Sequence, residues 1–283
     1  MNAQTISTGS LALDLALGGG GIPRGGVTVL YGGEGAGKTT LAALIAAEAQ
    51  KAGRVAAWID AEHSVDAKYA SALGIDIDSL LVSSPATAEE ALEVLETLVR
   101  SGGIDVVVLD SIAALLPRAE SDGRMGDDHR GESANLISRA LRRINSALLK
   151  TGAAAVLTNQ IREKVGVPYG NPEVTPGGRA LKFYASVLLE IRCIETFTRV
   201  SGLSGNRVKV KVVKNKSVPP GREAEFEIIF GKGICRAGSL LDIGVERGLI
   251  AQNGDSRESA RRSLEENPAL MNELEAAIRN CRA

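Results

Sequence analysis

Residues 32–39 read Gly32-Gly33-Glu34-Gly35-Ala36-Gly37-Lys38-Thr39, and they match every fixed position of the phosphate-binding pattern G-x-x-x-x-G-K-[ST]. An apolar segment, 27–31, comes before this stretch, and a helical run begins at Thr39. A strand, a glycine-rich turn and a helix start direct backbone N–H groups and the positive end of a helix dipole at one anion. The alternative is a turn that binds nothing, but the strand and the helix around the motif favour a site for a nucleoside triphosphate.

Within this motif, Lys38 is predicted to reach the β- and γ-phosphates, and the Thr39 hydroxyl is predicted to ligate Mg²⁺. The predicted nucleotide-binding residues of the loop are Gly32, Gly33, Glu34, Gly35, Ala36, Gly37, Lys38, Thr39 and Thr40.

Short apolar segments alternate with longer helical patterns along much of the chain. Helical stretches near 39–51, 65–73, 87–101 and 132–150 separate the first strands, a pattern typical of a parallel sheet buried between helices. The last strands follow one another without helices, which predicts antiparallel members at one edge. The expected strands are 27–31, 54–60, 104–110, 153–159, 185–191, 208–213 and 225–230.

The sequence therefore predicts an α/β fold of the P-loop NTPase type. We expect a mostly parallel central sheet, flanked by helices, in an ATPase core of residues 1–235. Helical patterns at 240–247, 256–265 and 268–280 predict a small helical appendage over residues 236–283.

Three strand ends carry the residue types that phosphate chemistry needs, and ligands of open α/β sheets bind at the carboxyl ends of strands. Asp110 ends strand 104–110 and is predicted to hold the Mg²⁺ that Thr39 also binds. Glu62 follows strand 54–60 and is predicted to orient or deprotonate the attacking water. A carboxylate that only stabilises the next helix start is the alternative for Glu62. Strand 153–159 ends at Thr158-Asn159-Gln160, and an amide side chain at this point is predicted to sense the γ-phosphate.

Basic residues gather in one part of a chain whose net charge is −1. Residues 161–222 contain 12 Lys and Arg against 4 Asp and Glu. This excess favours a local site for a polyanion, although a solvated basic face is the simpler alternative. Two long polar or glycine-rich loops, at about 118–131 and 162–178, also stand out by composition, and loops of this length are usually functional or disordered.

The composition argues against several other classes of protein. Three cysteines without a C-x-x-C pair, and only two histidines, indicate neither a disulfide framework nor a zinc site. No apolar run approaches the length of a membrane span, and the N-terminus has no signal-peptide layout. We expect a cytoplasmic protein without a membrane partner.

Several further segments occur together with the phosphate-binding loop in one order. They are DAEH at 60–63, VVVLDS at 106–111, TNQIR at 158–162, GNPE at 170–173, PGGRALKFYAS at 176–186 and KVKVVKNK at 209–216. In this combination the chain resembles the bacterial RecA family of recombinases over nearly its whole length. The GNPE and KVKVVKNK segments argue against the alternatives of a P-loop kinase or a hexameric helicase.

The resemblance implies a DNA-dependent ATPase of homologous recombination that uses ATP and Mg²⁺. Its partners are single-stranded and double-stranded DNA, and its activity is strand exchange in DNA repair, as part of the SOS response to DNA damage. Asp66 and Tyr69 match positions that contact the adenine, and Lys214 and Lys216 match lysines that reach the ATP of a neighbouring subunit. The implied catalytic set is Glu62, Lys38, Gln160, Lys214 and Lys216. The implied DNA-binding residues are Arg142, Arg162, Lys164, Tyr169, Gly177, Gly178 and Arg179.

The chain also departs from the family pattern. The family has a helix and a strand ahead of the segment that here begins at Ile6, and its C-terminal domain is longer, with a hairpin between positions 250 and 257. The resemblance implies that the loops at about 118–131 and 162–178 are the first and second DNA-binding loops, and Asn135 stands where the first usually has arginine. Two hypotheses therefore stay open: a recombinase that assembles into a helical homo-oligomer, and a core or regulator that binds ATP and DNA without forming active filaments.

Overall fold

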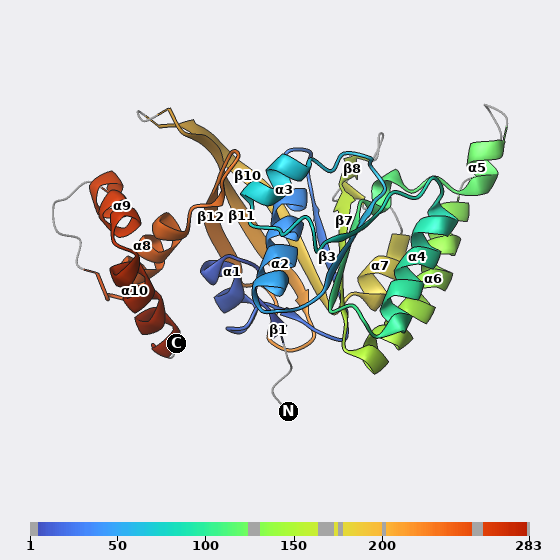
Figure 1. Cartoon of the computed structure of the whole chain (residues 1–283), viewed down its shortest axis with the longest axis horizontal. Coiled ribbons are helices and arrows are strands. Elements are labelled where there is room, and N and C mark those ends of the chain that lie inside the picture. The colour runs from blue at the N-terminus through green and yellow to red at the C-terminus, as the bar shows by residue number, and fades with distance from the viewer. Residues whose placement is uncertain are drawn as a thin grey trace.

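In the described part of the chain, nine strands form one mixed sheet at the centre of the molecule (Figure 1). The computed structural model describes residues 5–123, 131–163, 173–174, 178–199, 202–250 and 257–281. Across the sheet the order is β13 (Gly233–Ile234), β12 (Glu223–Ile229), β11 (Ser204–Asn215), β10 (Val187–Thr198), β3 (Val27–Gly32), β7 (Ala154–Gln160), β6 (Val106–Asp110), β4 (Ala56–Asp60) and β5 (Leu81–Ser83).

The six strands from β10 to β5 run parallel, and β11, β12 and β13 are added antiparallel at the β10 side. This confirms the predicted mostly parallel sheet with antiparallel strands at one edge. The predicted strands are all present, although β10 and β11 extend to 12 residues each.

Helices cover both faces of the sheet because its central strands are apolar on both sides. In β6, Val106 and Val108 belong to the core under α2 (Lys38–Lys51), whereas Val107 and Leu109 belong to the opposite core. Helices α4 (Ala88–Ser101), α6 (Glu132–Thr151) and α7 (Gly178–Tyr184) contribute to that second core. Strands buried on both faces lack polar alternation, and this explains why their sequences read as continuous apolar runs.

Several short elements were not predicted from the sequence. The predicted loop at 118–131 begins with a helix, α5 (Arg118–Asp122), and the loop at 162–178 contains a two-residue strand pair, β8 (Arg162–Glu163) and β9 (Glu173–Val174). The other unpredicted elements are β1 (Thr5–Ile6), α1 (Leu11–Ala16), β2 (Ile22–Pro23), η1 (Ile112–Ala114) and the strands β5 and β13, together with α7. Helix α3 (Ala67–Ala72) matches a predicted helix.

The C-terminal helices α8 (Arg236–Glu246), α9 (Arg257–Glu266) and α10 (Pro268–Asn280) gather beside the antiparallel end of the sheet (Figure 1). We call these three helices the C-terminal helical group. Leu240, Ile243 and Ile278 of this group pack against Leu11 of α1. The division of the chain into domains at residue 235 stays a prediction.

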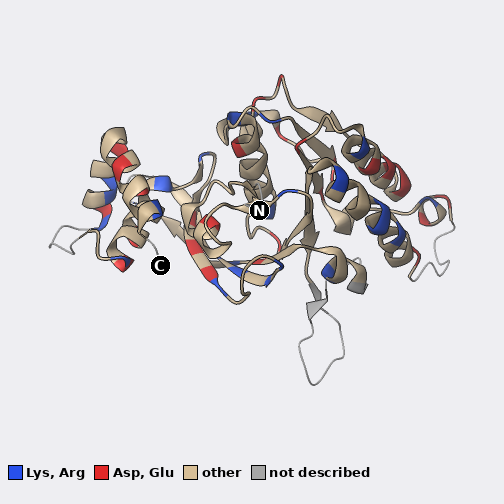
Figure 2. Ribbon diagram, turned by 90° about the horizontal axis from the view of Figure 1, so that it is seen from below, with Lys and Arg blue, Asp and Glu red and all other residues tan. Residues whose placement is uncertain are grey.

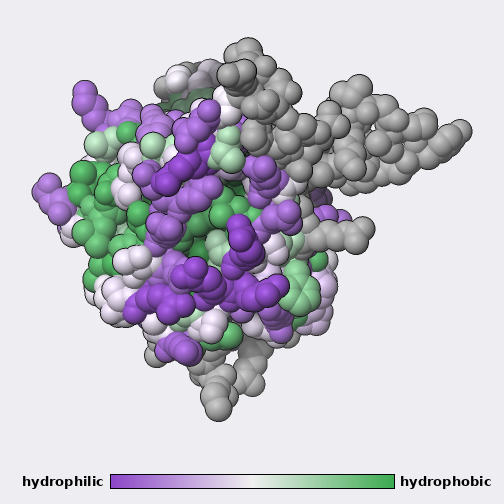
Figure 3. Space-filling model, turned by 90° about the vertical axis from the view of Figure 1, so that its right-hand side faces the viewer, coloured by the Kyte–Doolittle hydropathy of each residue, from purple (hydrophilic) through white to green (hydrophobic). Residues whose placement is uncertain are grey.

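The surface on the side of α4 and α6 is largely hydrophilic, with apolar residues gathered toward one side of this face (Figure 3). Among the exposed apolar side chains are Leu81 and Val82 of β5, the last strand of the sheet. None of the described helices combines the length and apolar character that a membrane span requires.

Helix α6 provides a test of the packing. Leu141 is fully buried against α4 and the sheet, whereas Leu149 on the same helix is 70% exposed. Leu141→Ala is expected to lower the free energy of unfolding by about 2–5 kcal/mol, because it leaves a cavity in the core. Leu149→Ala, the matched control, should change it by less than about 0.5 kcal/mol. Urea denaturation measures both, and equal losses would contradict this packing.

Candidate nucleotide-binding site

The phosphate-binding loop joins β3 to α2 and depends on glycine at particular positions. Gly37 is the N-cap of α2 and has φ +93°, a conformation that favours glycine. A Cβ atom at Gly37 would also lie 2.6 Å from Cδ1 of Ile228. At Gly32 a Cβ atom would lie 2.0 Å from the carbonyl oxygen of Ile191, so this glycine is required where β3 pairs with β10.

The side chain of Lys38 turns back into the loop. Its Nζ atom donates to the carbonyl oxygens of Gly33 at 2.7 Å and Gly32 at 3.2 Å. Burial lowers the pKa of Lys38, and the negative charges of Asp110, Glu62 and Glu34 oppose that change. The ammonium group therefore lies at the start of α2, where backbone N–H groups and the helix dipole attract anions.

Hydroxyl groups surround the carboxylate of Asp110 at the end of β6. Thr158 of β7 donates a hydrogen bond to Asp110, and Thr39 of α2 is a second hydrogen-bond partner. Asp110 is 3% exposed, and burial raises the pKa of its carboxyl group despite these hydrogen bonds. Thr39 and Asp110, the two predicted Mg²⁺ ligands, thus lie together.

The described residues include no group of three or more His, Cys, Asp or Glu side chains that could hold a metal by themselves. Mg²⁺ does not need one, because it is usually held by one or two carboxylates together with substrate phosphates and water. Thr39 and Asp110 beside the phosphate-binding loop fit this type of site.

Glu62 lies next to Asp110 because β4 and β6 are neighbours in the sheet. Asp60 pairs with Asp110, and the N–H of Ala61 donates to the Asp110 carbonyl oxygen at 2.8 Å. The Ser111 hydroxyl donates to Oε1 of Glu62 at 2.5 Å. The Glu62 side chain is exposed, and its position beside the predicted metal ligands is open to solvent.

Gln160 completes this edge of the sheet. It ends β7 and pairs with Gly32, the last residue of β3. The order β3–β7–β6–β4 therefore brings Gly32, Gln160, Asp110 and Asp60 to one edge. The catalytic roles of Glu62 and Gln160 stay predictions.

A cavity of about 240 Å³ beside the loop includes Tyr69, one of the two residues predicted to contact adenine. The Tyr69 hydroxyl lies 2.7 Å from Oγ1 of Thr40. Asp66 caps α3 by accepting hydrogen bonds from the N–H groups of Lys68 and Tyr69, at 2.8 Å and 3.3 Å. The residues that line the cavity are Gly35, Gly37, Lys38, Thr39, Thr40, Tyr69, Asn206, Ile228 and Phe230.

Asn206, Ile228 and Phe230 were not predicted from the sequence. Nδ2 of Asn206 donates to the carbonyl oxygen of Gly35 at 3.3 Å, and Phe230 is 54% exposed. Strand β12 is antiparallel to β11, which is antiparallel to β10, so β12 runs in the same direction as β3. The rule that ligands bind at the carboxyl ends of strands therefore applies to β12 as well. Phe230, the aromatic residue that directly follows β12, was thus a signal in the sequence for this part of the site.

The sequence of this chain is similar to those of known proteins. The RecA N-terminal domain model matches residues 1–235. Protein RecA of Frankia alni is 54% identical, over 98% of this chain and 83% of that protein. Protein RecA of Clostridium novyi is 52% identical, and that of Symbiobacterium thermophilum 53%, each over 99% of this chain and 83% of the relative. The chain belongs to the RecA family. Membership in this family of NTPases supports a function in recombination and DNA repair.

Lys214 and Lys216, which the RecA resemblance assigns to a neighbour's ATP, lie away from the loop of their own chain. Lys214 pairs with Leu188 of β10, and Leu188 pairs with Val29, three residues before the end of β3. The N–H of Lys216 donates to the carbonyl oxygen of Ser186, just before β10. Nζ of Lys214 donates to the carbonyl oxygens of Lys182 at 2.7 Å and Phe183 at 3.1 Å. Burial lowers the pKa of Lys214. Both lysines thus lie toward the opposite end of the sheet, and their catalytic role stays a prediction.

Of the predicted DNA-binding residues, Arg142 is described with its side chain. It is exposed on α6, and its Nε donates to the Tyr184 hydroxyl at 3.4 Å. Figure 2 shows the basic stretches of α6 beside acidic stretches of α4, and Arg143 of α6 lies 2.9 Å from Glu96 of α4.

The other predicted DNA-binding residues lie in or near the second loop. The structure gives the backbone of Arg162, Gly178 and Arg179, at the starts of β8 and α7. Lys164, Tyr169 and Gly177 lie outside the described residues.

Lys38→Ala tests the loop. Hydrogen bonds to charged groups contribute about 1.5–3 kcal/mol, so the variant is expected to bind nucleotide about 10- to 100-fold more weakly. Lys51→Ala is the matched control, because Lys51 ends the same helix and pairs with Glu48 on the surface. Titration with a fluorescent ATP analogue measures both affinities. An unchanged affinity for Lys38→Ala would exclude this loop as the phosphate site.

Proposed function

We propose that this chain is a DNA-dependent ATPase of homologous recombination, which binds ATP and Mg²⁺, assembles on single-stranded DNA and promotes pairing and strand exchange with duplex DNA. The observation that carries the proposal is the gathering of Lys38, Gln160, Asp110 and Glu62 at one edge of the sheet in a chain of the RecA family. The same proposal gives the chain a cytoplasmic role in the response to DNA damage, including the SOS response.

Phosphate binding uses groups that the loop already holds together. Backbone N–H groups of 33–39 surround the triphosphate, and Lys38 transfers its hydrogen bonds from the carbonyls of Gly32 and Gly33 to phosphate oxygens. Thr39 and Asp110 would hold Mg²⁺, which would supply positive charge to the phosphates. Asp66, Tyr69 and Phe230 would contact the adenine; Tyr69 and Phe230 line the cavity beside the loop.

Hydrolysis requires a water molecule in line with the γ-phosphate. Glu62 lies next to the metal ligands, where its exposed carboxylate orients and deprotonates that water. The Ser111 hydroxyl holds one oxygen of Glu62 and leaves the other for the water. Gln160, at the end of the neighbouring strand, hydrogen-bonds the γ-phosphate and couples it to the second DNA-binding loop.

Lys214 and Lys216 act on the ATP of the next subunit. Their place toward the opposite end of the sheet from their own loop supports this role, because a head-to-tail contact brings opposite ends of two copies together. The edge strand β5, with Leu81 and Val82 exposed, is a second surface suited to contact between copies. Positive charge supplied across the interface stabilises the transferring phosphoryl group.

DNA binding uses the two loops at 118–131 and 162–178 together with Arg142. The excess of basic residues in 161–222 supports contact with a phosphate backbone, which is not sequence-specific. The two loops contain a single aromatic residue, Tyr169, so stacking with bases contributes less than backbone contact. Added salt weakens such binding strongly.

Glu62→Gln tests the proposed base. The amide keeps the size of the side chain but cannot accept the proton, so hydrolysis is expected to slow about 10²- to 10⁴-fold while ATP affinity is retained. The release of phosphate and the titration of ATP measure the two effects separately. The variant should also stay on DNA longer. If it hydrolyses ATP at the normal rate, the base is another residue.

ATP hydrolysis with and without long single-stranded DNA, over a range of protein concentrations, tests the proposal as a whole. We expect DNA to stimulate turnover, and we expect the rate to rise cooperatively with concentration because each site needs a neighbour's lysines. Bound nucleotide with turnover that stays near zero at all concentrations would favour the alternative of a core or regulator that forms no active filament.

Mixing two inactive variants tests the contribution in trans. Lys38→Ala keeps the donated lysines, and Lys216→Ala keeps the phosphate-binding loop. In a random equal mixture, half of the subunits have an intact phosphate-binding loop, and half of their neighbours donate intact lysines. About a quarter of the sites in a head-to-tail assembly then have both, so about a quarter of the wild-type rate is expected. A mixture as inactive as the separate variants would argue against catalysis in trans.

A further inference from the structure

We infer that Glu227 is a positioning residue that ties the C-terminal helical group to the wall of the nucleotide site, so that this group controls nucleotide affinity. The inference rests on the proposed nucleotide site. It assigns a role to residues that take no part in phosphate or DNA contact.

The wall in question consists of β11 and β12. Cδ1 of Ile228 contacts Gly37 closely enough to exclude a Cβ atom there. Asn206, the register partner of Ile228, holds the Gly35 carbonyl oxygen at 3.3 Å. A shift of β12 therefore moves groups that touch the phosphate-binding loop at two glycines.

Glu227 precedes Ile228 in β12, so its side chain points to the opposite face of the sheet. There it receives two guanidinium groups. Arg199, just after β10, pairs with Oε2, and Arg257 lies 3.1 Å from Oε1. The side chains of Arg199 and Glu227 are each only 11% exposed, and a carboxylate so placed is held firmly because loss of either partner leaves a buried charge.

Arg257 connects this carboxylate to the C-terminal helical group. It begins α9, and its guanidinium also donates to both carboxylate oxygens of Asp242 in α8, at 3.0 Å and 2.8 Å. Glu258, the next residue of α9, lies 4.0 Å from Arg199. The backbone contributes as well, since the N–H of Cys235 donates to the Glu227 carbonyl oxygen at 2.8 Å. We call Arg199, Glu227, Asp242 and Arg257 the ionic latch.

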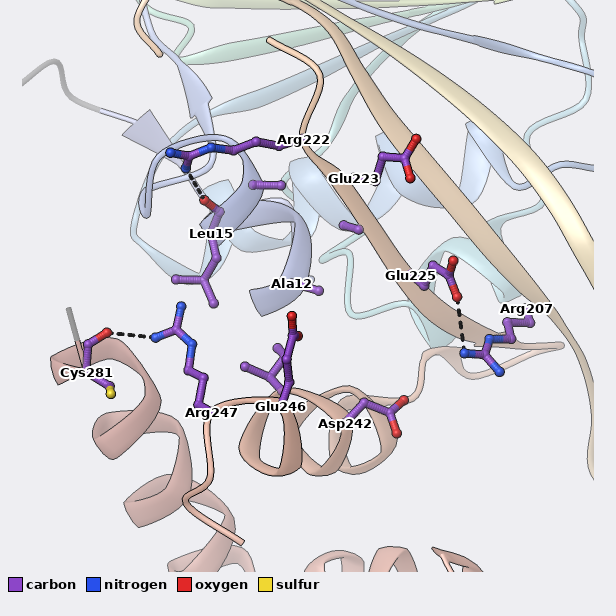
Figure 4. Close-up of a pocket in the computed structure, with 13 residues that line it drawn as sticks. Ala12, Leu15, Arg207, Arg222, Glu223, Glu225, Asp242, Glu246, Arg247 and Cys281 are labelled. Carbon is purple, nitrogen blue, oxygen red and sulfur yellow. Dashed lines mark hydrogen bonds and ion pairs between the residues drawn. The ribbon is translucent and has the colours of Figure 1, made fainter. Parts of the chain in front are cut away.

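Beside the latch, part of the helical group is separated from α1 and β12. A cleft of about 810 Å³ lies between α1 and β12 on one side and α8 on the other. In Figure 4, Glu223 and Glu225 of β12 face Asp242 and Glu246 of α8 across this cleft, and Arg222 and Arg247 reach backbone carbonyl groups. Apolar packing of α1, around Leu11, against the helical group is a further attachment.

Two adjacent residues of β12 are therefore held from opposite faces of the sheet. Ile228 contacts the phosphate-binding loop, and Glu227 is held by the helical group. Because the connection between them is one peptide unit, the position of α9 and the shape of the nucleotide wall are coupled. Coupling of this kind is reciprocal: a nucleotide that fixes the wall also strengthens the latch.

The test compares two arginines of the helical group. Arg257→Gln removes the link between α9 and Glu227. Arg236→Gln is the matched control, because Arg236 is similarly exposed and binds Glu275 and Asn272 within the group, without contact to β12. The affinity of the full chain for a fluorescent N-methylanthraniloyl derivative of ATP with Mg²⁺ is measured for each.

Arg257→Gln is expected to raise the dissociation constant about 5- to 20-fold, a typical size for coupling between sites. Arg236→Gln should change it less than about twofold. Glu227→Gln should weaken binding too, and the double variant with Arg257→Gln should be no weaker than the weaker single one, because both act through one contact. In the wild type, nucleotide should increase hydrogen-exchange protection of α9, and Arg257→Gln should abolish that increase.

Equal affinities for wild type and Arg257→Gln would overturn the inference and leave the proposed function intact. Equal weakening by Arg257→Gln and Arg236→Gln would also overturn it, since the cause would then be general loosening of the helical group. A wild-type chain that binds no nucleotide would overturn both the inference and the proposed function.

Discussion

The parallel pairing of β3, β7, β6 and β4 is the constraint on which the candidate site depends. Each strand delivers one residue to the same edge, and neighbouring strands lie about 4.8 Å apart, so the four ends form a row. Asp110 at one of these ends and Lys38, which begins α2, are both buried, and burial is costly for charged groups without partners. The structure offsets this cost with hydroxyl and carbonyl partners: Thr158 and Thr39 for Asp110, and Gly32 and Gly33 for Lys38.

The central strands and their terminal residues could be predicted because their sequence signal is local. A strand buried on both faces is continuously apolar, and the first polar residue after it marks its carboxyl end, as in Val106–Asp110. The wall made by Asn206, Ile228 and Phe230 could not be predicted in the same way. It exists only because the chain reverses direction twice, from β10 through β11 to β12, and the sequence shows those reversals without showing which ends then coincide.

The short helices could not be predicted from the sequence for a different reason. Helix α1 has six residues and α7 has seven, too few for a helical period to stand out. Both are fixed by tertiary contacts, as for Leu13 and Leu181, which are almost completely buried. The register of β11 had a similar consequence for Lys214 and Lys216. Their sequence segment predicts a strand, but only pairing with β10 reveals that they lie away from the loop of their own chain.

Ion pairs within the C-terminal helical group neutralise four of its arginines. Arg236, Arg257, Arg261 and Arg279 each lie within 3.2 Å of a carboxylate of the same group. Charges neutralised at such short range contribute little to the field beyond a Debye length of about 8–10 Å. The basic stretch at 161–222 is neutralised in part as well: Arg192, Arg199, Arg207 and Lys209 pair with carboxylates, whereas Lys214 binds carbonyl groups, which leave its positive charge uncompensated. The four arginines named above therefore stabilise the packing of the helical group and, through Arg257, its attachment to β12.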